Sequence, residues 1–254
     1  MSQEIVLKIE DLTKSFGGVK AINKVSFDLF KGEIFGIIGP NGSGKTTLVS
    51  LITGFIKPDS GNVYFKGKKI TGLAPYKIVD IGIARTFQIM RPYHSLKAYK
   101  NLIVPLFSPR VRRFSGGKTG DRDAIAIDLL EEVGFERDAF VPYKLASALP
   151  LGYLKRLELA RCLALRPEVI ICDEIFSGLS MSEIASMIPL IEKIHLGGKT
   201  ALIMIEHRLR ELFRVTSRIM VLDFGIKIAE GVPADVVRDK RVKEAYFGTS
   251  EVKL

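Results

Sequence analysis

The chain has 254 residues, 47% of them hydrophobic, which is enough to bury one large α/β core or a core with an inserted subdomain. Its formal net charge of +10 permits an anionic partner, but the basic residues are spread along the sequence, and no zinc-finger spacing or recognition-helix pattern accompanies them. Apolar runs such as residues 201–205 are far shorter than the roughly 20 residues of a membrane-spanning helix, and residues 1–4 show no export signal, so we expect a soluble, cytoplasmic protein.

The first part of the chain predicts strands around a glycine-rich loop. Apolar and polar residues alternate, or nearly so, over 5–9 and 25–29, and a continuous apolar run over 34–38 is typical of a buried strand. A helix is expected to open near Thr47, and a turn at 58–61 precedes a further short strand, which favours an antiparallel sheet beside strand 34–38. The strands predicted here are 5–9, 25–29, 34–38 and 62–65.

The middle of the chain has a different pattern, mostly helices and loops from about residue 89 to 157. Apolar residues recur at i, i+3, i+4 and i+7 from Ala126 to Val133, which predicts one apolar helix face, and Gly134 is placed to end that helix. We therefore expect a helical subdomain inserted into the α/β core. The densest basic cluster lies here in a segment with serine and glycine, where we expect a solvated loop: Arg110, Arg112, Arg113, Lys118 and Arg122.

The α/β pattern resumes after this insertion. Short apolar runs predict buried parallel strands, and an apolar stripe from Ile184 to Ile191 predicts a helix closed by Gly197 and Gly198. Strands that alternate with helices predict a three-layer fold. Cys162 and Cys172 lie in apolar surroundings without metal-ligand spacing, so we expect reduced core thiols. The strands predicted here are 169–172, 201–205, 219–222 and 226–229, the last two joined by a turn at 223–225.

The most specific motif is the run from Gly39 to Thr46, which has the spacing G-x-x-x-x-G-K-[ST] between a predicted strand and a predicted helix. Its glycines let backbone N–H groups wrap phosphate oxygens, and the helix N-terminus adds a positive dipole end. Lys45 can reach the β- and γ-phosphates, and the Thr46 hydroxyl can ligate Mg²⁺. The sequence therefore predicts a phosphate-binding loop formed by Gly39, Pro40, Asn41, Gly42, Ser43, Gly44, Lys45, Thr46 and Thr47.

Two acidic residues, Asp173 and Glu174, follow the apolar strand 169–172. A carboxylate at the position of Asp173 can hold Mg²⁺ directly or through water, and Glu174 can polarise a water for in-line attack on a γ-phosphate. Two acids at a strand end also occur without any such function. The phosphate-binding loop upstream favours the catalytic interpretation.

Three further residues gain meaning from their order along the chain. Gln88 lies at the entry to the helical segment, and its amide can orient a water and contact Mg²⁺. His207 follows strand 201–205, where a neutral imidazole can hydrogen-bond the γ-phosphate or the attacking water. Phe16 lies beside two glycines and can stack on an adenine ring. Taken alone, each of these residues is more typical of an ordinary surface or structural position.

In this order the motifs resemble the ATP-binding subunit of an ATP-binding cassette (ABC) transporter, over nearly the whole chain. The resemblance implies a P-loop NTPase (RecA-like) α/β core formed by residues 1–88 and 158–254, with an antiparallel β subdomain. It also implies that residues 89–157 are an inserted helical subdomain that carries the family's signature segment. The implied activity is Mg²⁺-dependent hydrolysis of ATP. The implied catalytic residues are Glu174, His207, Gln88 and Lys45, and the implied magnesium site is Thr46, Gln88 and Asp173.

Several short sequence segments resemble those of one subfamily, the ATPases of branched-chain amino acid importers. Those ATPases are similar to ones that serve urea or other amides, which leaves the cargo open. The resemblance implies a peripheral location on the inner face of the cell membrane, with integral permease subunits, a second homologous ATPase subunit in a heterodimer or homodimer, and, indirectly, an extracellular solute-binding protein. It implies no nucleic-acid partner. The matching segments are 86–88, 205–209, 221–225, 228–231 and 244–248.

The signature segment departs from the family's usual Leu-Ser-Gly-Gly-Gln. Residues 149–153 are Leu-Pro-Leu-Gly-Tyr, so Gly152 is kept while Pro150, without a hydroxyl or an N–H, takes the serine position. The resemblance implies that a partner's ATP loses one charge-assisted hydrogen bond here, typically about 1.5–3 kcal/mol. Ile175 and Ser180 also replace the family's usual Pro and Asp. The resulting hypothesis is a heterodimer, since the family's motifs for binding this chain's own nucleotide, Walker A at residues 39–46 and Walker B through Asp173 and Glu174, are intact.

Two other functions stay open from the sequence. A non-transport ABC protein of DNA repair or translation is favoured only by the +10 charge, and the chain lacks the second cassette or long coiled coil usual in that class. A regulatory nucleotide-binding module with little turnover is suggested by Pro150, but the intact Glu174 and His207 argue against it. Residues 223–225 spell the magnesium motif of protein kinases, yet no H-R-D loop precedes them and they join two predicted strands.

Overall fold

The computed structural model describes residues 4–114, 120–197 and 200–247. Lys118, Gly198 and Gly248, on which parts of the sequence interpretation fell, lie outside the described residues, as do residues 1–3.

Strand β3 (Ile34–Ile38), which leads into the glycine-rich loop, lies inside a six-stranded sheet. It runs parallel to both of its neighbours, and all five of its residues are buried. Burial on both faces explains why the strand is a continuous apolar run. Only the last strand, at one edge, is antiparallel to its neighbour. The strand order is β10 (Ile226–Gly231), β9 (Arg218–Asp223), β3, β8 (Ala201–Ile205), β7 (Val169–Asp173) and β6 (Ile83–Arg85).

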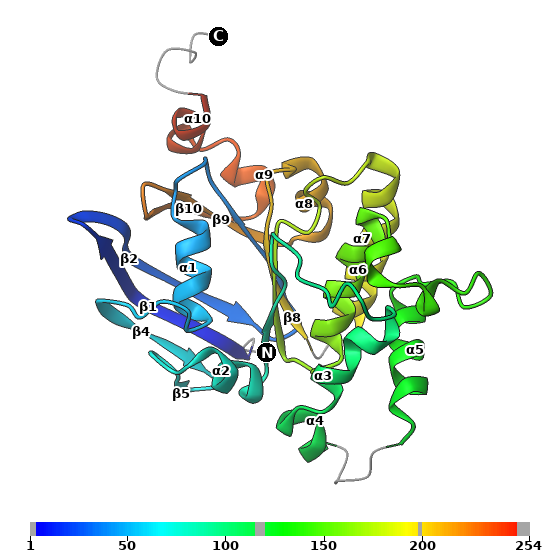
Figure 1. Cartoon of the computed structure of the whole chain (residues 1–254). Coiled ribbons are helices and arrows are strands. Elements are labelled where there is room, and N and C mark those ends of the chain that lie inside the picture. The colour runs from blue at the N-terminus through cyan, green and yellow to red at the C-terminus, as the bar shows by residue number, and fades with distance from the viewer. Residues whose placement is uncertain (1–3, 115–119, 198–199, 248–254) are drawn as a thin grey trace.

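A second sheet is antiparallel and covers helix α1 (Lys45–Ile52) from the other side (Figure 1). Its side chains and those of the helix share one core cluster with the six-stranded sheet, for example Leu7, Leu48 and Ile37. The predicted antiparallel subdomain is therefore present, although its first two strands are longer than the sequence pattern suggested. The strand order is β2 (Val19–Phe30), β1 (Ile5–Phe16), β4 (Ser60–Phe65) and β5 (Lys68–Lys69).

Helices cover the opposite face of the six-stranded sheet, which gives the layered arrangement that alternating strands and helices predict (Figure 1). The stripe Ile184 to Ile191 of helix α7 packs here against Ile170 and Leu202. Cys162 and Cys172 are free thiols buried in this region, as expected. The helices of this half are α6 (Leu151–Leu163), α7 (Met181–Leu196), α8 (Leu209–Val215), α9 (Pro233–Val236) and α10 (Lys240–Phe247).

The middle segment forms its own helical cluster with a separate core (Figure 1). Helix α5 (Arg122–Glu132) begins where the Asp121 carboxylate accepts hydrogen bonds from two backbone N–H groups, and Gly134, with φ +85°, follows its end. The boundary expected at residue 157 falls inside α6, so that division of domains stays a prediction. The other elements are η1 (Tyr99–Leu102), α3 (Ile103–Leu106), α4 (Pro109–Phe114), η2 (Val141–Tyr143) and η3 (Ala146–Ala148).

The expectation of a solvated basic loop is wrong at Arg110, which lies in α4 and is buried. Its guanidinium donates to the backbone oxygens of Ile81 (2.8 Å) and Arg166 (2.9 Å). Ile81 is the last residue of α2 (Pro75–Ile81), and helix C-termini leave carbonyls unsatisfied, so a cation with several N–H donors is stabilised there. Arg110 thus joins the helical segment to the core.

Among the helices of the described residues, none combines the length and apolar character that a membrane crossing requires.

Candidate functional site

The carboxyl ends of the parallel strands bring the predicted nucleotide residues to one edge of the sheet. The loop 39–46 follows β3, Asp173 ends β7, and His207 follows β8 two residues after its end. Gln88 follows β6, the next strand outward. Ligands of open α/β sheets bind at this edge, beyond the carboxyl ends of the strands.

The glycines of the loop allow close backbone packing. Gly39 has φ +153°, and a Cβ built there would lie 2.1 Å from the backbone oxygen of Leu222. Gly44, directly before α1, has φ +103°, and a Cβ there would lie 2.5 Å from the oxygen of Ala21. Any larger residue at either position would force the backbone apart, so the loop geometry depends on glycine.

The Lys45 side chain folds back into the loop that carries it. Its Nζ donates to the backbone oxygens of Gly39 (2.8 Å) and Pro40 (2.9 Å), and the residue is only 6% exposed. Burial lowers the pKa of Lys45 from its ordinary value, while the nearby Glu174 and Asp173 act in the opposite direction. A phosphate oxygen that enters the loop would take up the same ammonium donors.

Glu174 stands between two residues that are distant from it in sequence. Its Oε2 accepts a hydrogen bond from Gln88 Nε2 at 2.7 Å, and its Oε1 lies 3.0 Å from Nε2 of His207. The backbone of Glu174 has φ +52°, a left-handed conformation that is costly for a residue with a side chain and persists only where its surroundings hold it. The three residues expected to act on the attacking water are therefore neighbours.

Two buried charged residues that sequence reasoning missed hold the turn of Glu174. Lys155 Nζ donates to the backbone oxygen of Glu174 at 3.0 Å, and Glu206 Oε1 accepts from the backbone N–H of Phe176 at 2.9 Å. Burial raises the pKa of Glu206 to about 8 and lowers the pKa of Lys155. The sequence offers weak signals for both: Glu206 directly follows an apolar strand, and Lys155 lies among leucines of a helix.

Asp173 forms a buried ion pair with Arg85, a third residue whose role the sequence did not indicate. Arg85 Nη2 and Asp173 Oδ2 are 2.7 Å apart. Asp173, Thr46 and Gln88 line one cavity, and carboxylate, hydroxyl and amide oxygens are the donors that Mg²⁺ prefers. Among the described residues, no group of three or more His, Cys, Asp or Glu side chains is placed to hold a metal ion.

Comparison with known proteins decides the family. The profile described as "ABC transporter" matches residues 22–177, more than half of the chain. The chain belongs to the ATP-binding cassette family. A second profile, "Branched-chain amino acid ATP-binding cassette transporter", matches residues 227–252. The family and the P-loop NTPase fold expected from the motif order are confirmed.

Relatives and solved structures agree with this assignment. The chain is 34% identical to the high-affinity branched-chain amino acid transport ATP-binding protein LivG of Escherichia coli K12, over 98% of this chain and 99% of that protein. Identity to the corresponding protein BraF of Pseudomonas aeruginosa is 32%, over 96% and 98%. A crystal structure of a nucleotide-free ATP-binding cassette from an ABC transporter superposes with a TM-score of 0.85 at 31% identity, over 96% and 99%. The ADP conformation of MJ1267, an ATP-binding cassette of an ABC transporter, superposes with a TM-score of 0.82 at 32% identity, over 96% and 99%.

The predicted signature segment, residues 149–153, lies at the start of α6. Pro150 precedes the helix and provides no side-chain cap. The Glu183 carboxylate, at the start of α7, lies close to the same helix end, because a Cβ built on Gly152 would meet Glu183 Oε1 at 2.7 Å. Hydrogen bonds from the Ser180 hydroxyl and N–H, and to a smaller extent the backbone of Gly152, lower the pKa of Glu183. A negative charge therefore already faces this helix N-terminus.

The remaining predicted site residues lie apart from the Glu174 group. Phe16 ends β1, is about half exposed, and has Lys14 Nζ 5.5 Å from its ring centroid. Within the described parts of the chain, no hydrogen bond or ring contact links Phe16, Pro150 or Gly152 to Glu174. Their contribution to nucleotide binding stays a prediction.

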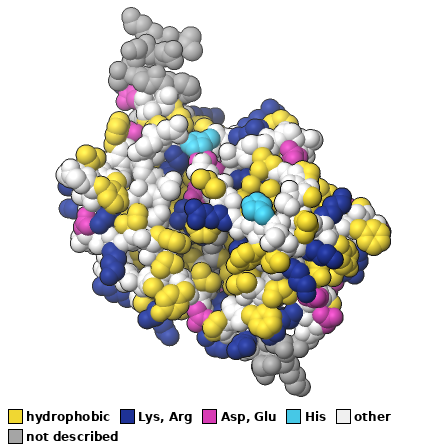
Figure 2. All heavy atoms as spheres, viewed as in Figure 1, with side chains coloured by type: hydrophobic (Ala, Val, Ile, Leu, Met, Phe, Trp, Pro, Cys, Tyr) yellow, Lys and Arg dark blue, Asp and Glu magenta, His cyan; other side chains and the backbone are white. Residues whose placement is uncertain are grey.

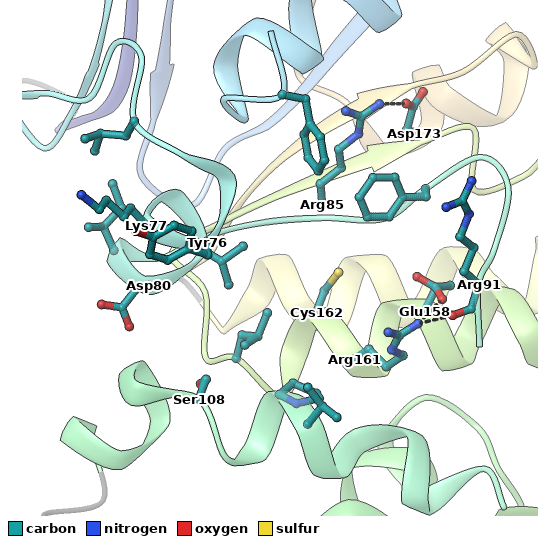
Figure 3. Close-up of a pocket in the computed structure, with 18 of the residues that line it drawn as sticks. Tyr76, Lys77, Asp80, Arg85, Arg91, Ser108, Glu158, Arg161, Cys162 and Asp173 are labelled. Atoms are coloured by element: carbon teal, nitrogen blue, oxygen red, sulfur yellow. Dashed lines mark hydrogen bonds and ion pairs between the residues drawn. The ribbon is translucent and has the colours of Figure 1, made fainter. Parts of the chain in front are cut away.

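A groove of about 1230 Å³ lies between the edge of the sheet and the helical segment (Figure 3). It extends from Asp173 and Arg85 past Gln88 to α2 and α3. Figure 2 shows hydrophobic side chains gathered over the lower part of the face, with lysine and arginine side chains among them. The exposed large apolar residues that line the groove are Phe55, Tyr76, Phe87, Ile89 and Val104.

Proposed function

We propose that this cassette hydrolyses ATP to drive the import of branched-chain or related amino acids. The catalytic part of this proposal rests on the Glu174 carboxylate. It contacts Gln88 and His207 at the same edge of the sheet as the phosphate loop. The profile match at residues 227–252 and the names of the relatives support the cargo class.

In the proposed reaction, backbone N–H groups of the loop and the Lys45 ammonium bind the β- and γ-phosphates. Glu174 orients the attacking water and accepts its proton, while Gln88 and His207 fix the carboxylate through their hydrogen bonds. A Mg²⁺ ion bound with the nucleotide would neutralise phosphate charge, and Thr46, Asp173 and Gln88 would hold it. The chain's own contribution is positioning and electrostatic stabilisation.

A second cassette is proposed to complete the site. A related cassette, 25% identical with a TM-score of 0.78, has been solved as a dimer in a post-hydrolysis state with ADP and phosphate bound. Pro150 and the Glu183 carboxylate at the signature helix favour a heterodimer, in which the partner supplies the complete signature for the nucleotide at Lys45.

Permease subunits are proposed to dock in the groove, with the cassette on the inner face of the membrane. Ile89 is 73% exposed and Tyr76 70% exposed, and such apolar side chains around a groove mark interaction surfaces. Phe87 and Ile89 flank Gln88 in sequence, so a change of Gln88 at the nucleotide reaches the groove wall directly.

The test uses this chain mixed with its candidate partner ATPase. Glu174→Gln keeps the shape of the side chain but removes the base, so we expect nucleotide binding to persist and turnover to fall about 10²–10⁴-fold. Glu192→Gln, an exposed acid on α7, is the matched control and should be neutral. Undiminished ATPase activity in the Glu174→Gln mixture would show that this chain's Walker site is not the hydrolysing one.

A further inference from the structure

Arg85 is a buried cation that the proposed reaction does not use. It is the last residue of β6, and its side chain is 9% exposed, while that of its partner Asp173 is 4% exposed. Arg85 Nη1 lies 3.4 Å from Oγ of Ser50, on α1, and 3.5 Å from Oγ1 of Thr53, which directly follows that helix. Arg85 Nε is buried without a hydrogen-bond partner among the described residues. A buried ion pair of this kind is weak evidence for stability, so another role is the better explanation.

The same guanidinium also contacts the wall of the groove. Its central carbon lies 5.2 Å from the ring centroid of Phe87, and the Phe87 ring meets the Phe55 ring edge-on, with centroids 5.9 Å apart. Figure 3 shows Arg85 extending toward Asp173 from the side of the groove. One side chain therefore touches a carboxylate of the nucleotide site and an aromatic residue of the proposed docking surface.

We propose that Arg85 is a positioning residue that neutralises Asp173 while the site holds no metal and shifts away when the carboxylate takes one, moving Phe87 with it. This inference rests on the proposed binding of ATP with Mg²⁺. Two cations beside one carboxylate repel each other strongly in a buried site, because the local dielectric screening is low. The Ser50 and Thr53 hydroxyls, already within 3.5 Å of Nη1, offer the guanidinium acceptors away from Asp173.

The direction of the coupling follows from these contacts. Arg85, Phe87 and Gln88 lie within four consecutive positions, so a displaced guanidinium changes the backbone segment that carries Gln88 as well as the Phe87 ring. Metal binding at Asp173 would then change the position of the Phe87 ring in the groove before any ATP is hydrolysed. Nucleotide without metal would leave Arg85 on Asp173 and the groove unchanged.

The chain contains no tryptophan, so Phe87→Trp places a single fluorescent indole against Arg85. The non-hydrolysable ATP analogue is bound in metal-free buffer, and MgCl₂ is then titrated while tryptophan emission is recorded. We expect no change on adding nucleotide alone and a saturable change with Mg²⁺. Tyr76→Trp, on α2 in the same groove but without an Arg85 contact, is the matched control and should not respond.

Variants at position 85 separate charge from packing. In the Phe87→Trp background, Arg85→Lys should keep the Mg²⁺ response, while Arg85→Met should abolish it and tighten Mg²⁺ binding at least threefold, since Asp173 loses its competing cation. Calorimetry on the same samples measures nucleotide and Mg²⁺ binding independently. If calorimetry shows saturation with Mg²⁺ and the emission of the Phe87→Trp protein with Arg85 intact stays constant, the inference is wrong and the proposed function stands. If no nucleotide binds, the proposed function is wrong as well.

Discussion

The Walker end of this cassette, residues 39–46 with Asp173 and Glu174, is braced by buried charged side chains, whereas the signature end, residues 149–153, is held nearer the surface, where the Tyr153 hydroxyl donates to Glu136. Gly225 donates to the backbone oxygen of Ser43 at 2.9 Å, and Lys155 and Glu206 hold the turn of Glu174. At the signature end, Pro150 begins α6 without a side-chain cap. The two ends of one chain are thus prepared for different tasks.

Electrostatics sharpen this contrast. At the Walker end the loop N–H groups and Lys45 present positive charge toward a ligand. At the signature end the Glu183 carboxylate already faces the N-terminus of α6, which compensates the helix dipole and places a like charge beside an incoming phosphate. This contrast supports the proposal that the chain serves its own nucleotide better than that of a partner.

The largest expected effect tests the Walker end directly. Lys45→Ala removes the buried ammonium and leaves the Gly39 and Pro40 oxygens without their donor. Loss of a charged hydrogen-bond donor to phosphate is worth about 1.5–3 kcal/mol, so affinity for ATP should fall about 10–150-fold. A fluorescent nucleotide titration measures this, with the exposed Lys193→Ala as control. Equal ATP affinities of the two variants would show that Lys45 does not bind the nucleotide.

The buried Glu206 predicts a pH dependence of stability. Because burial raises its pKa to about 8 from the ordinary value near 4.5, the folded chain binds more protons than the unfolded chain between these pH values. Stability should therefore fall as pH rises through this window, by up to about 1.4 kcal/mol per pH unit, and level off above about pH 8. Glu206→Gln keeps an acceptor for Phe176 and should flatten the curve, measured by urea unfolding from pH 5 to 9. Parallel curves for the two proteins would contradict an abnormal pKa.

Lys155 tests whether the brace matters for chemistry rather than for folding. Lys155→Met keeps the apolar stem but loses the hydrogen bond to the Glu174 oxygen, so the left-handed turn is held less firmly. We expect kcat in the mixed dimer to fall about tenfold, a loss of about 1.4 kcal/mol of transition-state stabilisation, with KM nearly unchanged. A parallel rise in KM would instead point to a disturbed nucleotide pocket.

The smallest effect is expected at the signature end. In a mixture where this chain carries Glu174→Gln, the remaining turnover reports the site completed by residues 149–153. Pro150→Ser should raise that turnover only a few-fold, less than the roughly tenfold or more of one charge-assisted hydrogen bond, because Glu183 still opposes the phosphate. Adding Glu183→Gln should raise it further, while Glu192→Gln should not. A full recovery with Pro150→Ser alone would show that the carboxylate is irrelevant.

The family, the phosphate loop, the acidic pair and the helical segment could all be predicted from the sequence; the comparisons confirm the family and the structure confirms the helical cluster, while the roles of the loop and the acids stay predictions. Each of these is written locally: a motif of fixed spacing, a continuous apolar run, or a helical period ended by glycine. Strand β6, only three residues long, escaped prediction because so short a run has no period. The lengths of β1 and β2 escaped it because bulges interrupt their alternation.

Which charged residues are buried, and which groups they contact, depends on the tertiary structure. Arg85 meets Asp173 across 88 positions, Phe176 meets Glu206 across 30, and Arg110 meets Arg166 across 56. In the sequence these residues look like ordinary surface charges, because burial depends on distant elements that close over them. Burying a charge without a partner costs free energy, so a charged residue is buried only where the fold supplies a partner for it. Its role can therefore be recognised only in the assembled structure.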